Sequence, residues 1–112
     1  MGVEIHPSSI VDPGADLGGD VIVVPFCYVG AGVQIGDGSK LHSHASVTGR
    51  TRLGTGVELY AHSALGGSPQ SIGFKDHPDS RLEVGDRTIF RESTSVHAGT
   101  PSYGGLTKIG DD

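Results

Sequence analysis

Residues 21–41 read V-I-V-V-P-F-C-Y-V-G-A-G-V-Q-I-G-D-G-S-K-L, and an aliphatic side chain recurs there at every sixth position. The same spacing continues in both directions and gives an unbroken series of aliphatic residues: Ile5, Val11, Leu17, Val23, Val29, Ile35, Leu41, Val47, Leu53, Leu59 and Leu65. A small or β-branched residue stands two positions before each of them. An α-helix repeats near 3.6 residues and a half-buried strand near 2. A period of six therefore indicates a short strand followed by a corner.

Three such units close one triangular coil, and successive coils stack with parallel strands about 4.8 Å apart. The pattern predicts an all-β protein in which a parallel β-helix domain spans residues 1–112. The composition agrees, because 19 Gly, three Tyr, three Phe and no Trp suit a slim core lined by Val, Ile and Leu. Gly often follows the aliphatic residue directly, which suits a tight corner.

The period breaks twice after Leu65. The next phased apolar residues are Val84, Phe90, Val96 and Ile109. The gaps predict two loop insertions, at about residues 67–80 and 98–108, both after the second face of consecutive coils. The two loops then leave the same corner, one above the other. Excursions from a regular solenoid usually carry binding residues, so the polar candidates are Gln70, Lys75, His77 and His97.

Phe26, His44 and His62 each follow a phased aliphatic residue by three positions and lie 18 residues apart. Stacked coils place them in one column. Two interpretations stay open: an ordinary surface ladder at a corner, or a ladder that faces another subunit.

The formal net charge of −5 and the scattered Lys and Arg residues argue against nucleic-acid binding. No apolar stretch approaches the ~20 residues of a membrane span, and Met1 to Pro13 show no secretory signal. Cys27 is the only cysteine, so no internal disulfide can form. These features together predict a soluble, cytoplasmic protein.

Several segments carry a more specific signal than the period itself. They include I-H-P-S-S-I-V at the start, V-P-F-C-Y-V-G-A-G-V-Q-I-G, L-H-S-H-A-S-V-T-G, L-Y-A-H-S-A-L-G, P-Q in the first loop, V-G-D-R-T-I-F-R-E-S, H-A-G-T and G-G-L-T-K-I-G. Over nearly its whole length the chain resembles the bacterial UDP-N-acetylglucosamine O-acyltransferases that depend on acyl carrier protein and begin lipid A synthesis. The resemblance implies that the β-helix is left-handed and that the protein is a homotrimer.

The resemblance also implies transfer of a 3-hydroxyacyl group from acyl carrier protein to the 3-hydroxyl of UDP-N-acetylglucosamine. A histidine acts as general base, and the acyl group arrives on the phosphopantetheine of the carrier, so no further cofactor or metal is expected. That histidine belongs to the coil after G-G-L-T-K-I-G, beyond Asp112, as do the remaining coils and the helical domain. The chain is therefore expected to be truncated within the β-helix, to contain no catalytic residue and to be inactive alone.

Within the chain, the resemblance implies substrate contacts at Gln70, Ser71 and His97. The family usually has Asp where Ser71 stands and Lys where Gly73 stands, which puts the sugar contacts in question. Three alternatives stay open: another hexapeptide sugar acyltransferase, a binding solenoid without activity, and a zinc enzyme. The zinc enzyme would share histidines across subunits around the metal and would draw nitrogen ligands from His44, His62 and His97.

Overall fold

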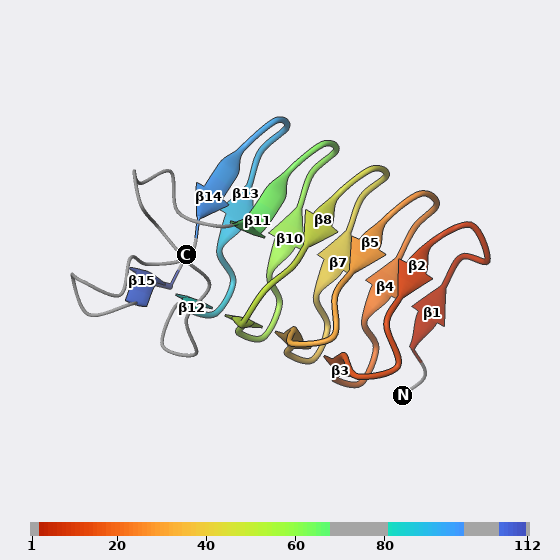
Figure 1. Ribbon diagram of the computed structural model, residues 1–112, viewed down its shortest axis with the longest axis horizontal. Coiled ribbons are helices and arrows are strands. Elements are labelled where there is room, and N and C mark those ends of the chain that lie inside the picture. Colours follow the sequence, from red (N-terminus) through yellow and green to blue (C-terminus); the bar gives the residue numbers. More distant parts are fainter. Residues whose placement is uncertain (1–2, 68–80, 98–105, 112) are drawn as a thin grey trace.

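The computed structural model describes residues 3–67, 81–97 and 106–111, in which every regular element is a short parallel strand. The strands form three sheets (Figure 1). Sheet A contains β1 (Glu4–Ile5), β4 (Ile22–Val23), β7 (Lys40–Leu41), β10 (Glu58–Leu59) and β13 (Ile89–Phe90). Sheet B contains β2 (Ile10–Val11), β5 (Tyr28–Val29), β8 (Ser46–Val47), β11 (Ala64–Gly67) and β14 (Ser95–His97). Sheet C contains β3 (Asp16–Leu17), β6 (Gln34–Ile35), β9 (Thr51–Leu53), β12 (Arg81–Val84) and β15 (Leu106–Ile109).

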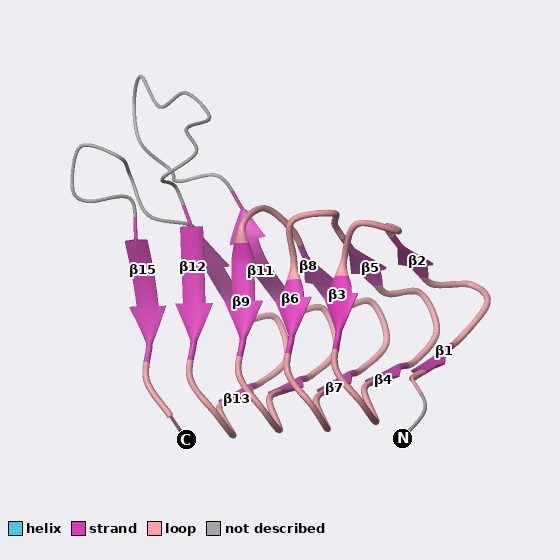
Figure 2. Cartoon of the chain, turned by 90° about the horizontal axis from the view of Figure 1, so that it is seen from below, coloured by secondary structure: helices cyan, strands magenta, loops and turns pink. Residues whose placement is uncertain are grey.

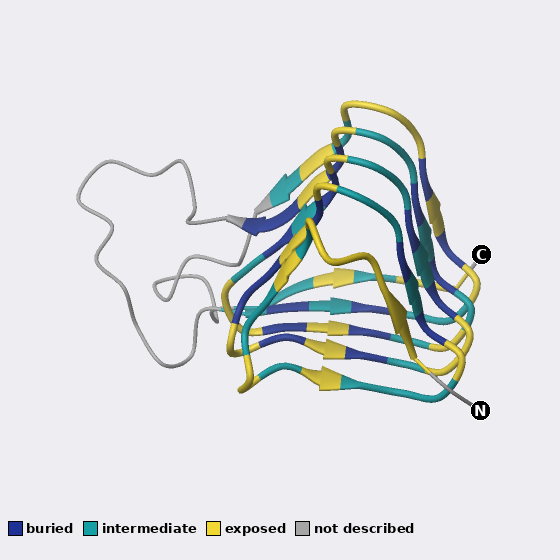
Figure 3. Cartoon of the chain, turned by 90° about the vertical axis from the view of Figure 1, so that its right-hand side faces the viewer, coloured by how far each residue is buried: buried dark blue, intermediate teal, exposed yellow. Residues whose placement is uncertain are grey.

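Each coil takes one strand from each sheet in turn, so the chain makes five coils, numbered 1 to 5 from the N-terminus. The strands of sheet C lie side by side in Figure 2, and the triangular cross-section is seen in Figure 3. The architecture is a left-handed parallel β-helix, and this prediction is confirmed. The three edges of the triangle are called here the A/B, B/C and C/A corners, after the sheets that they join.

The core is the set of phased aliphatic residues together with the small residues two positions earlier. From Val21 to Val84 almost every such side chain is at most 5% exposed, as expected for interiors in which two inward positions per strand face the axis. Aliphatic residues 18 positions apart pair in register, for example Val23 with Leu41 and Leu41 with Leu59. The six-residue period therefore sets both the burial and the register.

Polar residues in the core are satisfied by the next coil. The Ser9 hydroxyl donates to the Val24 carbonyl at 2.7 Å and accepts from the Cys27 amide at 2.9 Å. Ser39 repeats this arrangement five six-residue units later, with the Gly54 carbonyl at 3.2 Å and the Val57 amide at 3.1 Å. A buried hydroxyl costs little when it is hydrogen-bonded in this way, which explains why serine can occupy a core position here.

At the C/A corner the backbones of successive coils lie in close contact. A Cβ at Gly36 would lie 2.6 Å from the backbone of Gly54 in the coil above, so only glycine fits. Asp37 and Asp86 directly follow glycines of this corner, Gly36 and Gly85, and each bonds to the preceding coil. Asp37 Oδ1 accepts from the Gly19 amide at 2.9 Å, and Asp86 Oδ1 accepts from the Thr55 amide at 2.8 Å. These hydrogen bonds between aspartate side chains and backbone amides thus stabilise the stacking of successive coils.

The strand bounds correct the predicted loop limits. Gly67 belongs to β11, and residues 106–108 belong to β15, so the connections between strands span residues 68–80 and 98–105. Both lie outside the described residues. Among the described residues, no helix is long and apolar enough to cross a lipid bilayer.

Candidate functional site

The B/C corner of coils 4 and 5 is where the chain departs from the regular repeat. The first connection runs from the end of β11 to the start of β12, and the second from the end of β14 to the start of β15. Gly67 pairs with His97 where the connections begin, and Arg81 pairs with Leu106 where they return. The two insertions therefore begin and end on adjacent strands, which confirms the prediction that they share one corner.

The backbone of β11 is altered where the first connection begins. The pairing of β11 with β14 shifts register between Leu65 and Gly67, and Gly66 has a φ of +84°. A Cβ at Gly66 would lie 2.0 Å from the Thr48 carbonyl oxygen, so no other residue fits there. One coil earlier the corner closes without an insertion, where the Thr51 hydroxyl donates to the Thr48 carbonyl at 2.7 Å. The glycine and the bulge together redirect the chain away from the coil path.

The predicted site residues are only partly placed. Gln70, Ser71, Gly73, Lys75 and His77 lie outside the described residues. His97 is the last residue of β14, and its backbone lies at the B/C corner beside Gly67, at the foot of the second connection as predicted. Its side chain is not described, so its contacts with a substrate remain a prediction.

A basic hollow that was not predicted from the sequence lies on sheet C next to this corner. Its volume is about 250 Å³, and its lining includes Arg50, Arg52, Arg81 and Glu83. The Leu82 amide donates to the Arg50 carbonyl at 2.9 Å, so Arg50 and Arg81 occupy neighbouring positions in successive coils. Arg81 Nε lies 3.7 Å from Glu83 Oε2, which offsets part of the positive charge. Three guanidinium groups in one hollow can bind an anionic group such as a phosphate.

The sequence contained the signal for this hollow only indirectly. Arg52 lies on β9 and Arg50 directly precedes that strand, but Arg81 becomes their neighbour only when the length of the insertion of residues 68–80 is known. Because Arg81 follows Arg52 by 29 positions, the three arginines do not form a motif in the linear sequence.

The A/B corner carries the predicted aromatic column. Phe26, His44 and His62 all have a φ between +62° and +64°, which turns each ring outward in the same direction. The ring centroids of Phe26 and His44 lie 5.3 Å apart, and those of His44 and His62 lie 4.9 Å apart, both in stacked geometry. The ladder is therefore real and exposed. Whether it faces another subunit stays a prediction.

A second column runs beside this ladder. His42 Nε2 lies 2.6 Å from Glu58 Oε2, and the His42 ring lies 4.6 Å from the ring of Tyr60. Arg91 covers the other side of Tyr60, with its guanidinium carbon 4.1 Å from the ring centroid. Each of these residues is at least partly exposed, and they link coils 3, 4 and 5 on the outside of the β-helix. The contacts have the geometry of a stabilising surface network.

The zinc alternative finds no support in the described part of the chain. No group of three or more His, Cys, Asp or Glu side chains there is placed to hold a metal ion. His44 and His62 stack with parallel rings, and the backbone of His97 lies at the opposite end of the sheet B strands. Within a single chain, the three histidines named for that alternative do not converge on one corner.

Cys27 is a core residue. It is 3% exposed, and its Sγ donates to the His42 carbonyl at 3.0 Å. Burial raises the pKa of the Cys27 thiol above its ordinary value, although hydrogen bonds with the backbone of Ala45 and with Ser9 oppose the shift. A buried thiol held in its neutral form is a poor nucleophile, so Cys27 is not a candidate for covalent catalysis.

Solved structures share this fold and sequence over almost the whole chain. LpxA from Acinetobacter baumannii is 39% identical, with a TM-score of 0.89, and the match covers 96% of this chain and 41% of that one. The UDP-N-acetylglucosamine O-acyltransferase from Moraxella catarrhalis is 34% identical, with a TM-score of 0.92 and the same coverage. The chain is similar to the UDP-N-acetylglucosamine O-acyltransferases. The resemblance predicted from the sequence is thereby confirmed.

A hexapeptide acetyltransferase matches less well. The acetyltransferase domain of PglB from Neisseria gonorrhoeae is 25% identical, with a TM-score of 0.59, over 88% of this chain and 44% of that one. No protein-family model matches the chain. The chain spans about two fifths of the length of the acyltransferases that it resembles, so the described corner corresponds to only part of such a protein.

Proposed function

We propose that this chain is part of an O-acyltransferase that moves a 3-hydroxyacyl group from acyl carrier protein to the 3-hydroxyl of UDP-N-acetylglucosamine. The observation that carries the proposal is the match in fold and sequence to UDP-N-acetylglucosamine acyltransferases over 96% of the chain. The two insertions at one corner, with a basic hollow beside them, supply a physical reason for such a substrate.

The basic hollow fits the acceptor. UDP-N-acetylglucosamine carries a diphosphate, and guanidinium groups bind phosphate oxygens with paired hydrogen bonds. Arg50, Arg52 and Arg81 would hold the diphosphate on sheet C. The sugar would then extend toward the B/C corner, where His97 and the two insertions, including Gln70 and Ser71, begin or return.

The reaction itself is an acyl transfer. The sugar hydroxyl oxygen attacks the thioester carbonyl carbon and a C–O bond forms as the C–S bond breaks. A general base takes the hydroxyl proton and returns it to the departing thiol of the phosphopantetheine. The resemblance assigns that base to a histidine beyond Asp112, and we assign no described histidine to the role. The phosphopantetheine arrives with the carrier protein, so the enzyme needs no cofactor of its own.

The proposal includes a cellular setting. We place the protein in the cytoplasm, as a homotrimer, at the first step of lipid A synthesis, with acyl carrier protein as its protein partner. It would bind neither nucleic acid nor the membrane interior.

The test is an acyl-transfer assay on the purified protein that contains these residues together with any coils that follow them. Mass spectrometry would detect 3-O-acylated UDP-N-acetylglucosamine after incubation with a 3-hydroxyacyl carrier protein, and acetyl-coenzyme A would serve as the competing donor. Product from acetyl-coenzyme A alone would favour the alternative hexapeptide acetyltransferase. The absence of product from either donor, with a folded protein, would overturn the proposal.

Two variants test the role of the hollow. Arg81→Gln should raise the KM for UDP-N-acetylglucosamine about ten- to a hundredfold, since a lost charged hydrogen bond to a phosphate is worth roughly 1.5–3 kcal/mol. Lys40→Gln on sheet A is the matched control and should leave the KM unchanged. An equal effect of the two substitutions would remove the hollow from the substrate site.

A further inference from the structure

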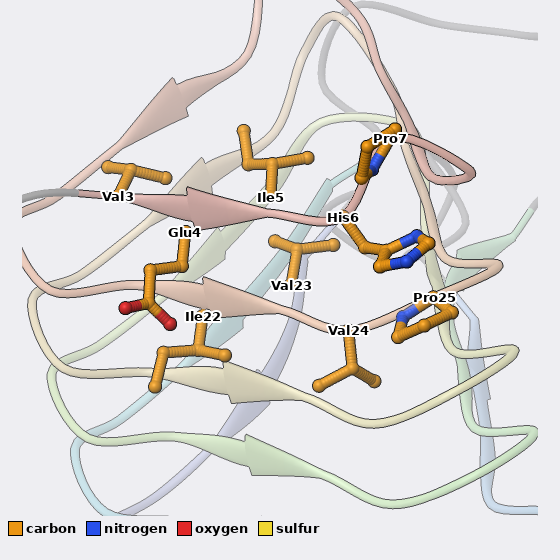
Figure 4. A pocket seen from close by; sticks show the side chains of 9 residues that line it. All are labelled: Val3, Glu4, Ile5, His6, Pro7, Ile22, Val23, Val24 and Pro25. Carbon is orange, nitrogen blue, oxygen red and sulfur yellow. The ribbon is translucent and has the colours of Figure 1, made fainter.

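Two hollows in the described part of the chain differ in the ligand that they can take. A cavity of about 580 Å³ on coils 1 and 2 is mostly apolar, and its lining contains Glu4 and no lysine or arginine (Figure 4). The basic hollow on sheet C instead gathers Arg50, Arg52 and Arg81. Guanidinium groups bind phosphate best when they are held in fixed positions. The residues that hold these arginines therefore decide how well the hollow binds.

The turn of residues 48–51 leads directly into β9. Arg50 in this turn, Thr51 at the start of β9 and Arg52 after it all belong to the lining of the hollow. Thr51 is 2% exposed, whereas Arg50 and Arg52 are exposed. Because successive side chains of a strand point to opposite faces, an inward Thr51 places both arginines on the outer face of sheet C.

The Thr51 side chain closes this turn. Its hydroxyl donates to the Thr48 carbonyl at 2.7 Å, and its amide donates to the Gly49 carbonyl at 3.1 Å. Gly66 of the next coil packs against both ends of the hydroxyl bond, since an added Cβ there would overlap the Thr48 carbonyl oxygen and Thr51 Oγ1. The backbone of Arg50 lies between these bonded groups, so the Thr51 hydroxyl limits how far Arg50 can move.

The next strand of sheet C rests on the same turn. β9 and β12 lie side by side in Figure 2, and Leu82 pairs with Thr51 in register. The Leu82 amide donates to the Arg50 carbonyl at 2.9 Å. Arg81 directly precedes Leu82 and so lies over Arg50. The turn therefore sets the position of Arg81 as well as that of Arg50.

A second threonine makes the same bond at another corner. The Thr94 hydroxyl donates to the Arg91 carbonyl at 2.7 Å, again three residues earlier, at the A/B corner of coil 5. Thr51 and Thr94 both stand two positions before a phased aliphatic residue. Thr94 does not belong to the lining of the hollow. A substitution at Thr94 thus removes the same type of hydrogen bond and leaves the arginines of the hollow in place.

We propose that Thr51 is a positioning residue for the basic hollow: its hydroxyl holds the turn of residues 48–51 so that Arg50 and Arg81 reach the same diphosphate. This role rests on the proposed function, which assigns the hollow to the acceptor. Thr51 does not contact the substrate and acts through the backbone of Arg50. A valine there would set a methyl group against the Thr48 carbonyl, where a carbon–oxygen contact needs about 3.3 Å instead of the present 2.7 Å. The resulting shift of about 0.6 Å exceeds the ~0.5 Å within which binding groups must be held.

The experiment measures UDP binding by isothermal titration calorimetry, on the protein that contains these residues together with any coils that follow them. Thr51→Val should weaken UDP binding about tenfold, and Thr51→Ser, which keeps the hydroxyl, should restore it. Thr94→Val should leave UDP binding unchanged. In the acyl-transfer assay, Thr51→Val should raise the KM for UDP-N-acetylglucosamine by the same factor without lowering kcat, because the ground state and the transition state lose the same contact.

A double variant separates positioning from a general loss of stability. In the Arg81→Gln protein the hollow has already lost one of the two guanidinium groups that the turn aligns. Adding Thr51→Val should then weaken UDP binding by clearly less than tenfold, since the two residues act on one contact. Should Thr51→Val fail to fold, Thr51→Ala takes its place, because it removes the hydroxyl without setting a methyl group against the Thr48 carbonyl.

The possible outcomes distinguish this role from the acyl transfer. Equal UDP binding by Thr51→Val and the unchanged protein, or an equal loss in Thr94→Val, would overturn the positioning role and leave the acyl transfer untouched. A loss in Thr51→Ser as large as in Thr51→Val, or full additivity in the double variant, would also overturn it. If the unchanged protein did not bind UDP, both this role and the assignment of the hollow to the diphosphate would be wrong. If the variants behaved as expected but no acylated sugar formed, the positioning role would stand and the proposed acyl transfer would be wrong.

Discussion

The close contact between coils at the C/A corner can be tested by adding one methyl group. In Gly36→Ala the new Cβ would lie 2.6 Å from both the carbonyl carbon and the oxygen of Gly54. Ordinary contact begins near 3.4 Å, so coil 3 has to move away by about 0.8 Å. The same movement would stretch the hydrogen bond from the Gly36 amide to the Leu53 carbonyl, now 3.0 Å, beyond the usual range.

The expected loss of stability follows from these two effects. Overpacking of a close contact typically costs about 1–3 kcal/mol, and a weakened hydrogen bond adds about 1 kcal/mol. Urea unfolding followed by circular dichroism should therefore show a decrease of about 2–4 kcal/mol. The control is Gly19→Ala at the same corner, where an added Cβ meets nothing within 4 Å and the variant should be close to neutral. If both variants unfolded at the same urea concentration, the argument from coil spacing would be wrong.

Three further predictions concern the core and the coil contacts. Leu59→Ala should cost about 2–5 kcal/mol because Leu59 is fully buried, while Leu17→Ala, at a partly exposed position of coil 1, should cost clearly less in the same urea titration. Since burial raises the pKa of Cys27, its contribution to stability should persist below the ordinary thiol pKa and decline as the pH rises through the folded-state value. The melting temperature of Cys27→Ala should therefore lack this decline at alkaline pH. If the melting temperatures of the variant and of the unchanged protein fell in parallel as the pH rises, the prediction would be wrong. Asp86→Ala removes the hydrogen bond from the Thr55 amide to Asp86 Oδ1 and should lower the free energy of unfolding by about 1 kcal/mol in the same urea titration. Asp86→Asn keeps an acceptor oxygen and should recover most of this loss.

Much of the fold could be predicted from the sequence because every six-residue unit has to bury an aliphatic side chain in the same way. An aliphatic residue at every sixth position can be buried only if every strand-and-corner unit has the same length, so the period gave the coil count and the register of Val23, Leu41 and Leu59. The position of the insertions followed from the same count. The limits of the insertions did not, because Leu106 continues the pairing of β12 and β15 before the next phased residue, Ile109.

The candidate site was less accessible, since it depends on which side chains lie side by side across coils. Arg50 and Arg81 become neighbours only when the length of the intervening insertion is known. Gln70 and Ser71 fall on that insertion, where no period fixes a position.

The corners of the β-helix have different roles: the C/A corner sets the spacing of the coils, and the B/C corner carries the candidate site. The C/A corner sets the spacing, since Gly36 and Gly54 allow backbone contact and Asp37 and Asp86 bond to the preceding coil. Because the strands of all sheets share one stacking distance, this corner also fixes how far Gly67 lies from its partner His97 at the B/C corner. A substitution at Gly85, whose added Cβ would lie 2.9 Å from the carbonyl carbon of Gly110 in coil 5, should thus reach the candidate site through the coil spacing alone. The proposed acyl transfer requires both insertions to meet one substrate and therefore a constant coil spacing, and the glycines of the C/A corner are the residues that set this spacing.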